Sequence, residues 1–446
     1  MGRTKRLRSI KKRNQNIVAE KCDSAISLYH YMRQFGWKNE KKLTCLNFST
    51  TGRGLCSKMT ILEEDPIIRL PLEAMITIAT LENDQDFRDL TEDLANFDTK
   101  VYFQSLLALY VLFQKHSNDS QFRQYIESIP SSFSTPYFCQ SDELYFLPEI
   151  VLLQSVDQNR KIRESYTAMQ TALGSKLCPC CGLQYFKEVF TLKDFKWAYF
   201  AVNSRSVFVN DYEIQPLVKD ASRAWVKKIL CDKPDMALAP FLDLFNHSDA
   251  ALTEPLIEKE DNHLHYQLIT KNSYQPYEQI FISYGNLTNL KLFTEYGFSL
   301  DDNSNDYFEI TLVDIEALIK TEAKFKGVFF HSNKFKFIRE HNLNDQMFIH
   351  ATDGLSHNLQ VVLYLIFKEP SHFPNVLNQT AFGSSVVFEQ SVEDEARLLC
   401  LFKIKEYQSF VDSLVKLKEL SSSGQASVVF LKHSISYLQK YLDKFV

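Results

Sequence analysis

Glycine is scarce in this sequence, with only 12 among 446 residues, and long apolar runs are missing. No uncharged apolar stretch approaches the ~18 residues of a membrane-spanning helix. The N-terminus also lacks the apolar segment of a secretory signal. Nine cysteines occur without regular spacing, which is typical of reduced thiols and not of a disulfide framework. These absences predict an intracellular protein with no membrane partner and no disulfides.

Apolar and aromatic residues are plentiful instead, at 45% and 13% of the chain. This content and the length are enough for a sizeable core and for two or three domains. The net charge is −5, but its sign is unevenly distributed.

The first 13 residues carry seven Lys or Arg and no acidic residue. Such a tail fits a nuclear targeting signal or a patch that binds polyanions, and a solvated disordered end fits equally well. We predict a basic flexible tail over 1–20 and a location in the nucleus and cytoplasm.

Strand patterns flank a helical block in this sequence. Short apolar segments broken by Gly and Pro predict strands within 43–77, and similar segments return after position 205. These later strands are predicted at 206–209, 237–245, 263–270 and 279–284. Between the two groups, 81–224 is mostly helical in pattern. Long amphipathic segments at 391–420 and 425–445 predict further helices.

The fold class predicted from this order is α+β. A β-rich domain at 21–300 is split by a helical insert at about 81–224, and an all-α domain follows at 301–446.

Two apolar segments end in polar tips. Asn246-His247-Ser248 follows the predicted strand 237–245, and Ser283-Tyr284-Gly285 follows 280–282. Polar groups at the end of buried strands are costly unless they bind something, so the two tips predict one shared site. Gly52-Arg53-Gly54-Leu55 lies in a turn between predicted strands, where missing Cβ atoms let a ligand approach the backbone. Alone, that turn indicates only a β-turn.

These motifs, followed by Glu295-Tyr296-Gly297-Phe298, form an ordered set that closely resembles the SET-domain protein methyltransferases. Within that family the chain is similar to the branch that contains the Rubisco large-subunit methyltransferase, over about 40–446. The resemblance implies a protein-lysine N-methyltransferase that uses S-adenosylmethionine. It also implies that the C-terminal helical domain binds the substrate.

The resemblance assigns roles to individual residues. Tyr284, beside the reacting methyl group, and Tyr296, a second aromatic wall of the substrate channel, would be catalytic. The residues implied in cofactor binding are Gly52, Arg53, Gly54, Leu55, Arg205, Asp243, Asn246, His247, Tyr284 and Phe298.

The chemistry of methyl transfer agrees with such a site. Displacement at a sulfonium methyl by an amine requires alignment and exclusion of water but no metal. Lysine has a reference pKa near 10.4, so making it neutral at pH 7 costs about 4.6 kcal/mol. An aromatic channel beside a positive sulfonium lowers that pKa through desolvation and like-charge repulsion.

The expected substrate is a protein with a target lysine. The basic tail suggests nuclear access and makes histones one candidate, but the acidic remainder of the chain would attract any basic protein. One relative in the branch methylates histidine and has an amide side chain two positions beyond the residue that matches Arg205. Val207 occupies that position here and offers an imidazole no partner, which favours lysine.

We expect a monomer that needs no direct contact with nucleic acid. The alternative is a non-catalytic SET-like module that holds a partner protein.

Cys178-Pro179-Cys180-Cys181-Gly182 resembles half of a zinc knuckle. Cys139 and Cys231 could complete four ligands only if the fold brought them close. A loop with exposed thiols is the other interpretation, and we assign no metal ligand from the sequence.

Overall fold

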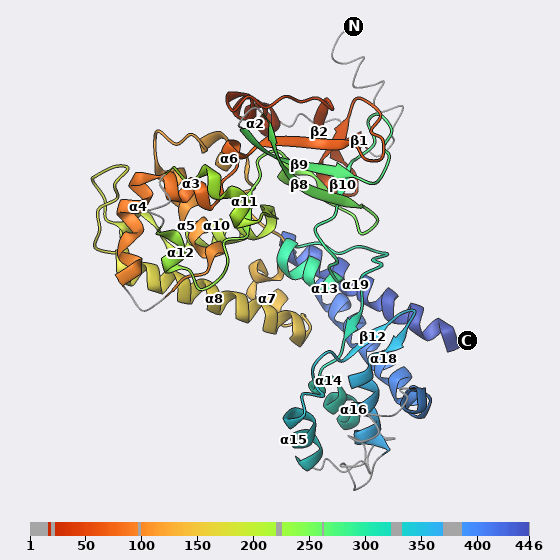
Figure 1. Ribbon diagram of the computed structural model, residues 1–446. Helices are drawn as coiled ribbons and strands as arrows, with labels where there is room; N and C mark the ends of the chain where they lie inside the picture. Colours follow the sequence, from red (N-terminus) through yellow and green to blue (C-terminus); the bar gives the residue numbers. More distant parts are fainter. Residues whose placement is uncertain are drawn as a thin grey trace. The chain divides into compact units, whose positions relative to one another are not determined.

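The chain forms two compact units in the computed structural model (Figure 1). The first comprises Met1–Ser132 and Asp157–Asn286, and the second comprises Phe133–Val156 and Leu287–Val446. The structure describes residues 17–18, 23–96, 100–219, 225–260, 263–322, 332–368 and 386–445. The basic tail predicted at 1–20 therefore lies almost entirely outside the described residues.

The unit boundaries differ from the predicted domain limits. Residues 133–156, which the sequence assigned to the helical insert, belong to the second unit. That unit resumes at Leu287 and not at 301. Helix α8 (Glu149–Leu173) spans the point where the chain leaves the second unit for the first.

Among the described residues of the first unit, four small sheets form the β structure, in the strand orders β1-β2-β3, β4-β9-β8, β5-β6 and β10-β7. The hairpin β2-β3 pairs Phe48 with Gly52 at its turn. The strands are β1 (Ile17–Val18), β2 (Leu43–Phe48), β3 (Gly52–Ser57), β4 (Pro66–Pro71), β5 (Ser206–Phe208), β6 (Met236–Leu238), β7 (Asn246–His247), β8 (Thr253–Glu260), β9 (His263–Thr270) and β10 (Phe281–Ile282).

The continuous strand predicted over 237–245 is wrong. β6 ends at Leu238, and the chain then passes through Pro240 and Phe241, which has φ +72°. A 3-10 turn, η6 (Leu242–Leu244), follows, and β7 begins only at Asn246. Proline cannot donate to a ladder and a positive φ breaks the extended backbone, so one apolar run becomes two short strands.

Helices fill the rest of the first unit, as the pattern at 81–224 predicted. α5 is buried along most of its length, which agrees with its apolar composition all round. α10 begins at a side-chain cap, because Thr191 Oγ1 accepts the Asp194 N–H. The helices are α2 (Asp23–Gln34), α3 (Ile78–Asn83), α4 (Gln85–Thr91), α5 (Phe103–His116), α6 (Arg123–Ser128), α9 (Phe186–Val189), α10 (Leu192–Arg205), α11 (Asp211–Ile214) and α12 (Val226–Ile229).

The second unit is mainly helical, in agreement with the predicted fold class. It also contains a three-stranded sheet, β11-β12-β13, that the all-α expectation did not include. Strands of two or three residues are too short for an alternating pattern to reveal them. Its elements are α7 (Ser141–Leu144), α13 (Asn289–Lys291), η7 (Leu292–Tyr296), β11 (Phe308–Glu309), α14 (Leu312–Thr321), α15 (Ser332–Glu340), β12 (Phe348–His350), β13 (Gly354–Leu355), α16 (His357–Phe367), α18 (Val386–Val415) and α19 (Ser422–Leu442).

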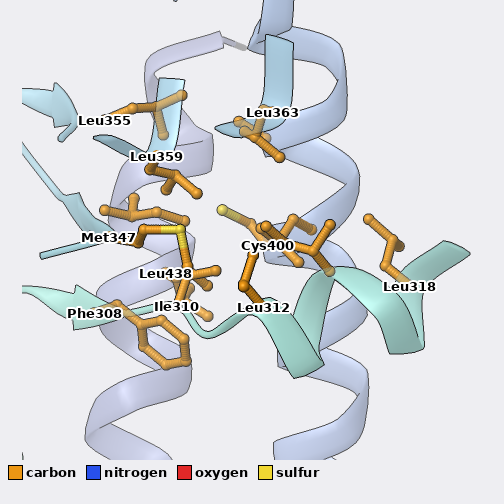
Figure 2. Close-up of a cluster of buried hydrophobic side chains, with 14 of the residues drawn as sticks. Phe308, Ile310, Leu312, Leu318, Met347, Leu355, Leu359, Leu363, Cys400 and Leu438 are labelled. Atoms are coloured by element: carbon orange, nitrogen blue, oxygen red, sulfur yellow. The ribbon is translucent and has the colours of Figure 1, made fainter. Parts of the chain in front are cut away.

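A cluster of buried apolar side chains joins these elements of the second unit. Figure 2 shows Leu312 and Leu318 of α14 facing Cys400 of α18, with Leu438 of α19 nearby. Burying a side chain such as Leu359, which has no exposed surface, stabilises the fold by about 1.5–3 kcal/mol.

Among the described residues, no helix combines the length and apolar character needed to span a membrane.

Candidate active site

The two polar tips lie together, as the sequence predicted. β7 and β10 pair in parallel, with Asn246 opposite Phe281 and His247 opposite Ile282. The backbone N–H of Ser248 donates to Ile282 O at 3.2 Å. Two segments separated by more than 30 residues therefore end side by side, and each delivers its polar residues to the same region.

His247 fastens one tip to the other. Its ring is buried and stacks on the Tyr284 ring, with centroids 5.1 Å apart and planes inclined by 27°. The Tyr284 N–H donates to His247 Nδ1 at 3.1 Å. The same Nδ1 atom also lies 3.3 Å from Ile282 O. Burial lowers the pKa of His247, which keeps the ring neutral.

Tyr284 is held at both ends. Its backbone donates to His247, and its hydroxyl donates to Phe245 O at 2.7 Å. Since the hydroxyl proton is used in this bond, the phenol oxygen presents lone pairs as acceptors. A ring fixed by two hydrogen bonds and one stacked neighbour has a defined orientation before any ligand binds.

The glycine turn of β3 lies against the Asn246 tip. Asn246 Nδ2 donates to Arg53 O at 3.0 Å. A Cβ atom on Gly54 would lie 2.8 Å from Asn246 Nδ2 and 2.6 Å from Gln279 Nε2, so only glycine leaves both amides in place. Gly52 has φ +69° and open space at its Cβ position, which leaves its backbone accessible.

Gln279 is a site residue that the sequence did not reveal. It is 7% exposed, and its Oε1 accepts the Thr51 hydroxyl at 2.9 Å. Its buried Nε2 has no hydrogen-bond partner among the described residues. The only sequence signal was a polar residue directly before the apolar segment 280–282.

Arg205 and Asp243 form a buried ion pair, with Arg205 Nη1 at 2.8 Å from Asp243 Oδ2. Their side chains are 12% and 1% exposed. The Tyr125 hydroxyl donates to the same carboxylate oxygen at 3.2 Å. Burial, together with the nearby Asp243 charge, raises the pKa of Tyr125 well above its usual value, so it remains a donor. Tyr125 carried no motif and was missed.

Asp243 reaches this position through a strained turn. Phe241 has φ +72°, which is rare for a bulky residue, and its ring packs on Trp37 with centroids 4.7 Å apart. The turn η6 that follows packs on β3, so the Asp243 carboxylate belongs to the same region as the glycine turn. Strain of about 1–3 kcal/mol is typical of residues that position a functional site.

Tyr296 and Phe298 belong to the second unit. Tyr296 ends the π-helix η7, and Gly297 follows with φ +81°. The Tyr296 and Phe298 ring centroids are 6.2 Å apart. Burial and the neighbouring Glu295 raise the pKa of Tyr296 to about 12, so its hydroxyl stays protonated. The shared site of Tyr296, Phe298 and Tyr284 stays a prediction from the resemblance.

One further cluster has the chemistry of a metal site. The ligand atoms of His116, Cys178, Cys180 and Cys181 lie within 4.8 Å of one another in the first unit. The partner of the Cys178–Cys181 segment is therefore His116. Cys139 belongs to the second unit, and Cys231 is not a member of the group.

Comparisons with known proteins agree with this architecture. The family model of the SET domain matches residues 52–285, more than half of the chain. SET domain-containing protein 4 of Artemia parthenogenetica is 28% identical over 92% of this chain and 94% of its own length. Actin-histidine N-methyltransferase of Otolemur garnettii is 26% identical over 60% of this chain and 41% of its own length.

A solved structure of the SET domain of LSMT, bound to lysine and AdoHcy, has the same fold. Its TM-score is 0.59 at 17% identity, and the match covers 96% of this chain and 92% of that one. The fold predicted from the resemblance is confirmed. The match to the family model contains the glycine turn, the β7 tip and the β10 tip, and the chain belongs to the SET-domain methyltransferase family.

Proposed function

We propose that this protein transfers a methyl group from S-adenosylmethionine to the ε-amine of a lysine in a protein substrate. The observation that carries the proposal is the β7–β10 pair, which brings the Tyr284 tip beside the Asn246 tip, while the Asn246 amide bonds the glycine turn and the Tyr284 hydroxyl bonds Phe245 O. Family membership supplies the reaction class and the cofactor. The solved relative bound to lysine supports the choice of side chain.

The residues around the glycine turn fit this cofactor. Asp243 Oδ1 and Gln279 Nε2 are a buried acceptor and a buried donor without partners in the described part of the chain. S-Adenosylmethionine carries ammonium, carboxylate and hydroxyl groups that could satisfy both kinds of atom. The backbone of 52–55, Asn246 and His247 would hold it, with Arg205 and Asp243 supporting that wall. When bound, it supplies an electrophilic methyl group on a positive sulfonium.

Tyr284 would position the attacking amine. Its hydroxyl donates to Phe245 O, and a lone pair of the phenol oxygen would accept an N–H of a neutral lysine and aim the nitrogen lone pair. Its aromatic face also favours the cationic charge near the reacting atoms. Neutralising the lysine costs about 4.6 kcal/mol at pH 7, which a desolvated channel reduces. Tyr296 and Phe298 would form further aromatic walls of that channel.

Val207 supports lysine over histidine. It lies in β5 opposite Ala237, and its side chain has no group that can bond an imidazole nitrogen. The similarity to an actin-histidine N-methyltransferase makes this choice worth testing directly. With Val207→Asn, we expect measurable methylation of histidine-containing peptides and reduced preference for lysine. An unchanged preference would remove Val207 as the determinant.

The direct test uses labelled S-adenosylmethionine, purified protein and mixed candidate proteins, including histones. We expect label on lysine, and about a 10²-fold slower transfer by Tyr284→Phe. Equal labelling by wild type and Tyr284→Phe would contradict the role of the phenol. Lack of cofactor binding in calorimetry would favour a non-catalytic protein-binding module.

Basic proteins such as histones are the substrate class that we propose, because the chain carries a net charge of −5. We also propose that the protein acts as a monomer in the nucleus and cytoplasm. Deleting residues 1–15 and following the location of the protein tests the tail. Unchanged nuclear entry would remove the tail from the argument.

A further inference from the structure

A cysteine-rich hairpin in the first unit joins α8 to α9. It is closed by a bridge between Leu177 and Tyr185 and by the Phe186 N–H, which donates to Lys176 O at 2.9 Å. Inside it, Gly182 has φ +62° and donates its N–H to Cys178 O at 2.8 Å. This tight turn gathers three cysteines at the tip of the hairpin. The methyl-transfer site uses none of them.

The sulfur atoms converge on a residue far away in sequence. His116, the last residue of α5, joins Cys178, Cys180 and Cys181 in a group whose ligand atoms all lie within 4.8 Å of one another. The sulfurs of Cys178 and Cys180 are 2.9 Å apart. Two sulfurs bound to one zinc at ~2.3 Å each in a tetrahedron lie about 3.8 Å apart. The Cys178–Cys180 separation is shorter than that value, and all four ligand atoms lie within 4.8 Å, so side-chain shifts of about 1 Å would complete the tetrahedron.

The surroundings suit a closed site. Cys178 is fully buried, and the other three residues are partly buried. The Nε2 atom of His116 is buried and has no hydrogen-bond partner among the described residues, which leaves it available as a ligand.

We propose that His116, Cys178, Cys180 and Cys181 bind one structural Zn²⁺ ion. Three thiolates and one imidazole are a donor set typical of closed structural zinc sites. The ion would fasten the hairpin between α8 and α9 to the end of α5. α5 packs against α10, whose last residue is Arg205, so the metal would stabilise the helical scaffold behind the buried ion pair.

The test measures metal in the full-length protein, purified without chelators from zinc-supplemented cells. We expect about one zinc per chain by elemental analysis. Cobalt exchanged into the protein should give the visible absorption of a tetrahedral site and a thiolate-to-cobalt charge-transfer band. Wild-type protein with less than about 0.1 zinc per chain and no such cobalt spectrum would overturn the proposal.

Variants separate the ligands from other thiols. Cys181→Ser and His116→Ala should lose most of the zinc, whereas His116→Cys, which restores a fourth ligand, should retain it. Cys231→Ser is the matched control, because Cys231 is an exposed thiol outside the group, and it should bind zinc like the wild type. Full zinc content in Cys181→Ser would contradict the assignment.

A disulfide is the competing outcome for the two close sulfurs. Thiol titration of the denatured, metal-free protein should find all nine cysteines reduced. A count of two fewer free thiols in the wild type, with no such deficit attributable to a disulfide in Cys178→Ser, would mean that Cys178 and Cys180 are joined. That result would overturn the zinc site. None of these measurements depends on methyl transfer.

Discussion

The candidate site in the first unit and the core of the second unit are stabilised in different ways. Short segments such as β7 and β10 are held by polar contacts, including the buried Arg205–Asp243 pair and the Tyr284–Phe245 hydrogen bond. The second unit joins long helices through a continuous apolar cluster (Figure 2). A buried polar group loses stability when its specific partner is removed, whereas an apolar core tolerates substitution by another apolar side chain of similar volume. Single substitutions should therefore act differently in the two regions.

The largest effect is expected from breaking the buried ion pair. Asp243→Ala leaves the Arg205 guanidinium buried without its carboxylate and removes the acceptor of Tyr125. The free energy of unfolding should fall by about 3–5 kcal/mol in urea titration. The double variant Arg205→Met, Asp243→Ala should recover part of that loss, because no uncompensated charge remains. A double variant less stable than Asp243→Ala would contradict this account of the pair.

A backbone clash should have the next largest effect, in the second unit. Gly297 has φ +81°, and a Cβ there would lie 2.6 Å from the carbonyl carbon of Ser134 and 2.8 Å from Thr135 N. Gly297→Ala should destabilise the protein by about 3 kcal/mol in the same titration. Gly36→Ala is the control, because Gly36 has φ +77° but nothing within 4 Å of its Cβ position. Its cost should be about 1–2 kcal/mol, and equal losses would show that contacts at Gly297 do not matter.

A buried carboxyl group in the second unit, that of Asp306, should make the free energy of unfolding depend on pH. Burial raises the pKa of Asp306 to about 6, against the hydrogen bonds that Asn289 donates to it. A raised folded-state pKa means that the folded protein binds the proton more tightly than the unfolded chain. The unfolding free energy should therefore fall by roughly 2 kcal/mol as pH rises from about 4 to about 6. Asp306→Asn should remove this change, and an unaltered pH profile in the variant would exclude Asp306 as its source.

The sequence predicted the long elements and the family motifs well. β9, α5 and α18 have patterns of eight residues or more, so their periodicity was visible. The order of Gly54, Asn246 and Tyr284 predicted a common site, and the β7–β10 pair brings the Asn246 and Tyr284 tips together.

Other features could not be predicted, because they depend on contacts distant in sequence. Gln279 meets Thr51 across 228 positions, and Tyr125 meets Asp243 across 118. Phe241 adopts a positive φ that no local pattern of apolar residues indicates. His116 lies at the end of a helix and comes close to the cysteine hairpin only in the folded chain. A lone histidine at a helix end gives no sequence signal of a metal site. Each is a residue whose role comes from its tertiary neighbours.

We propose that the first unit separates cofactor binding from methyl transfer, with Asn246 serving cofactor binding and Tyr284 serving methyl transfer. The most direct measurement compares calorimetric S-adenosylmethionine affinity with single-turnover methyl transfer for Asn246→Ala and Tyr284→Phe. Asn246 bonds the glycine-turn backbone, so its loss should weaken cofactor binding by about 10-fold. Tyr284→Phe should bind nearly as the wild type does but transfer about 10²-fold more slowly. Unaltered cofactor affinity in Asn246→Ala, together with unaltered transfer by Tyr284→Phe, would contradict the account.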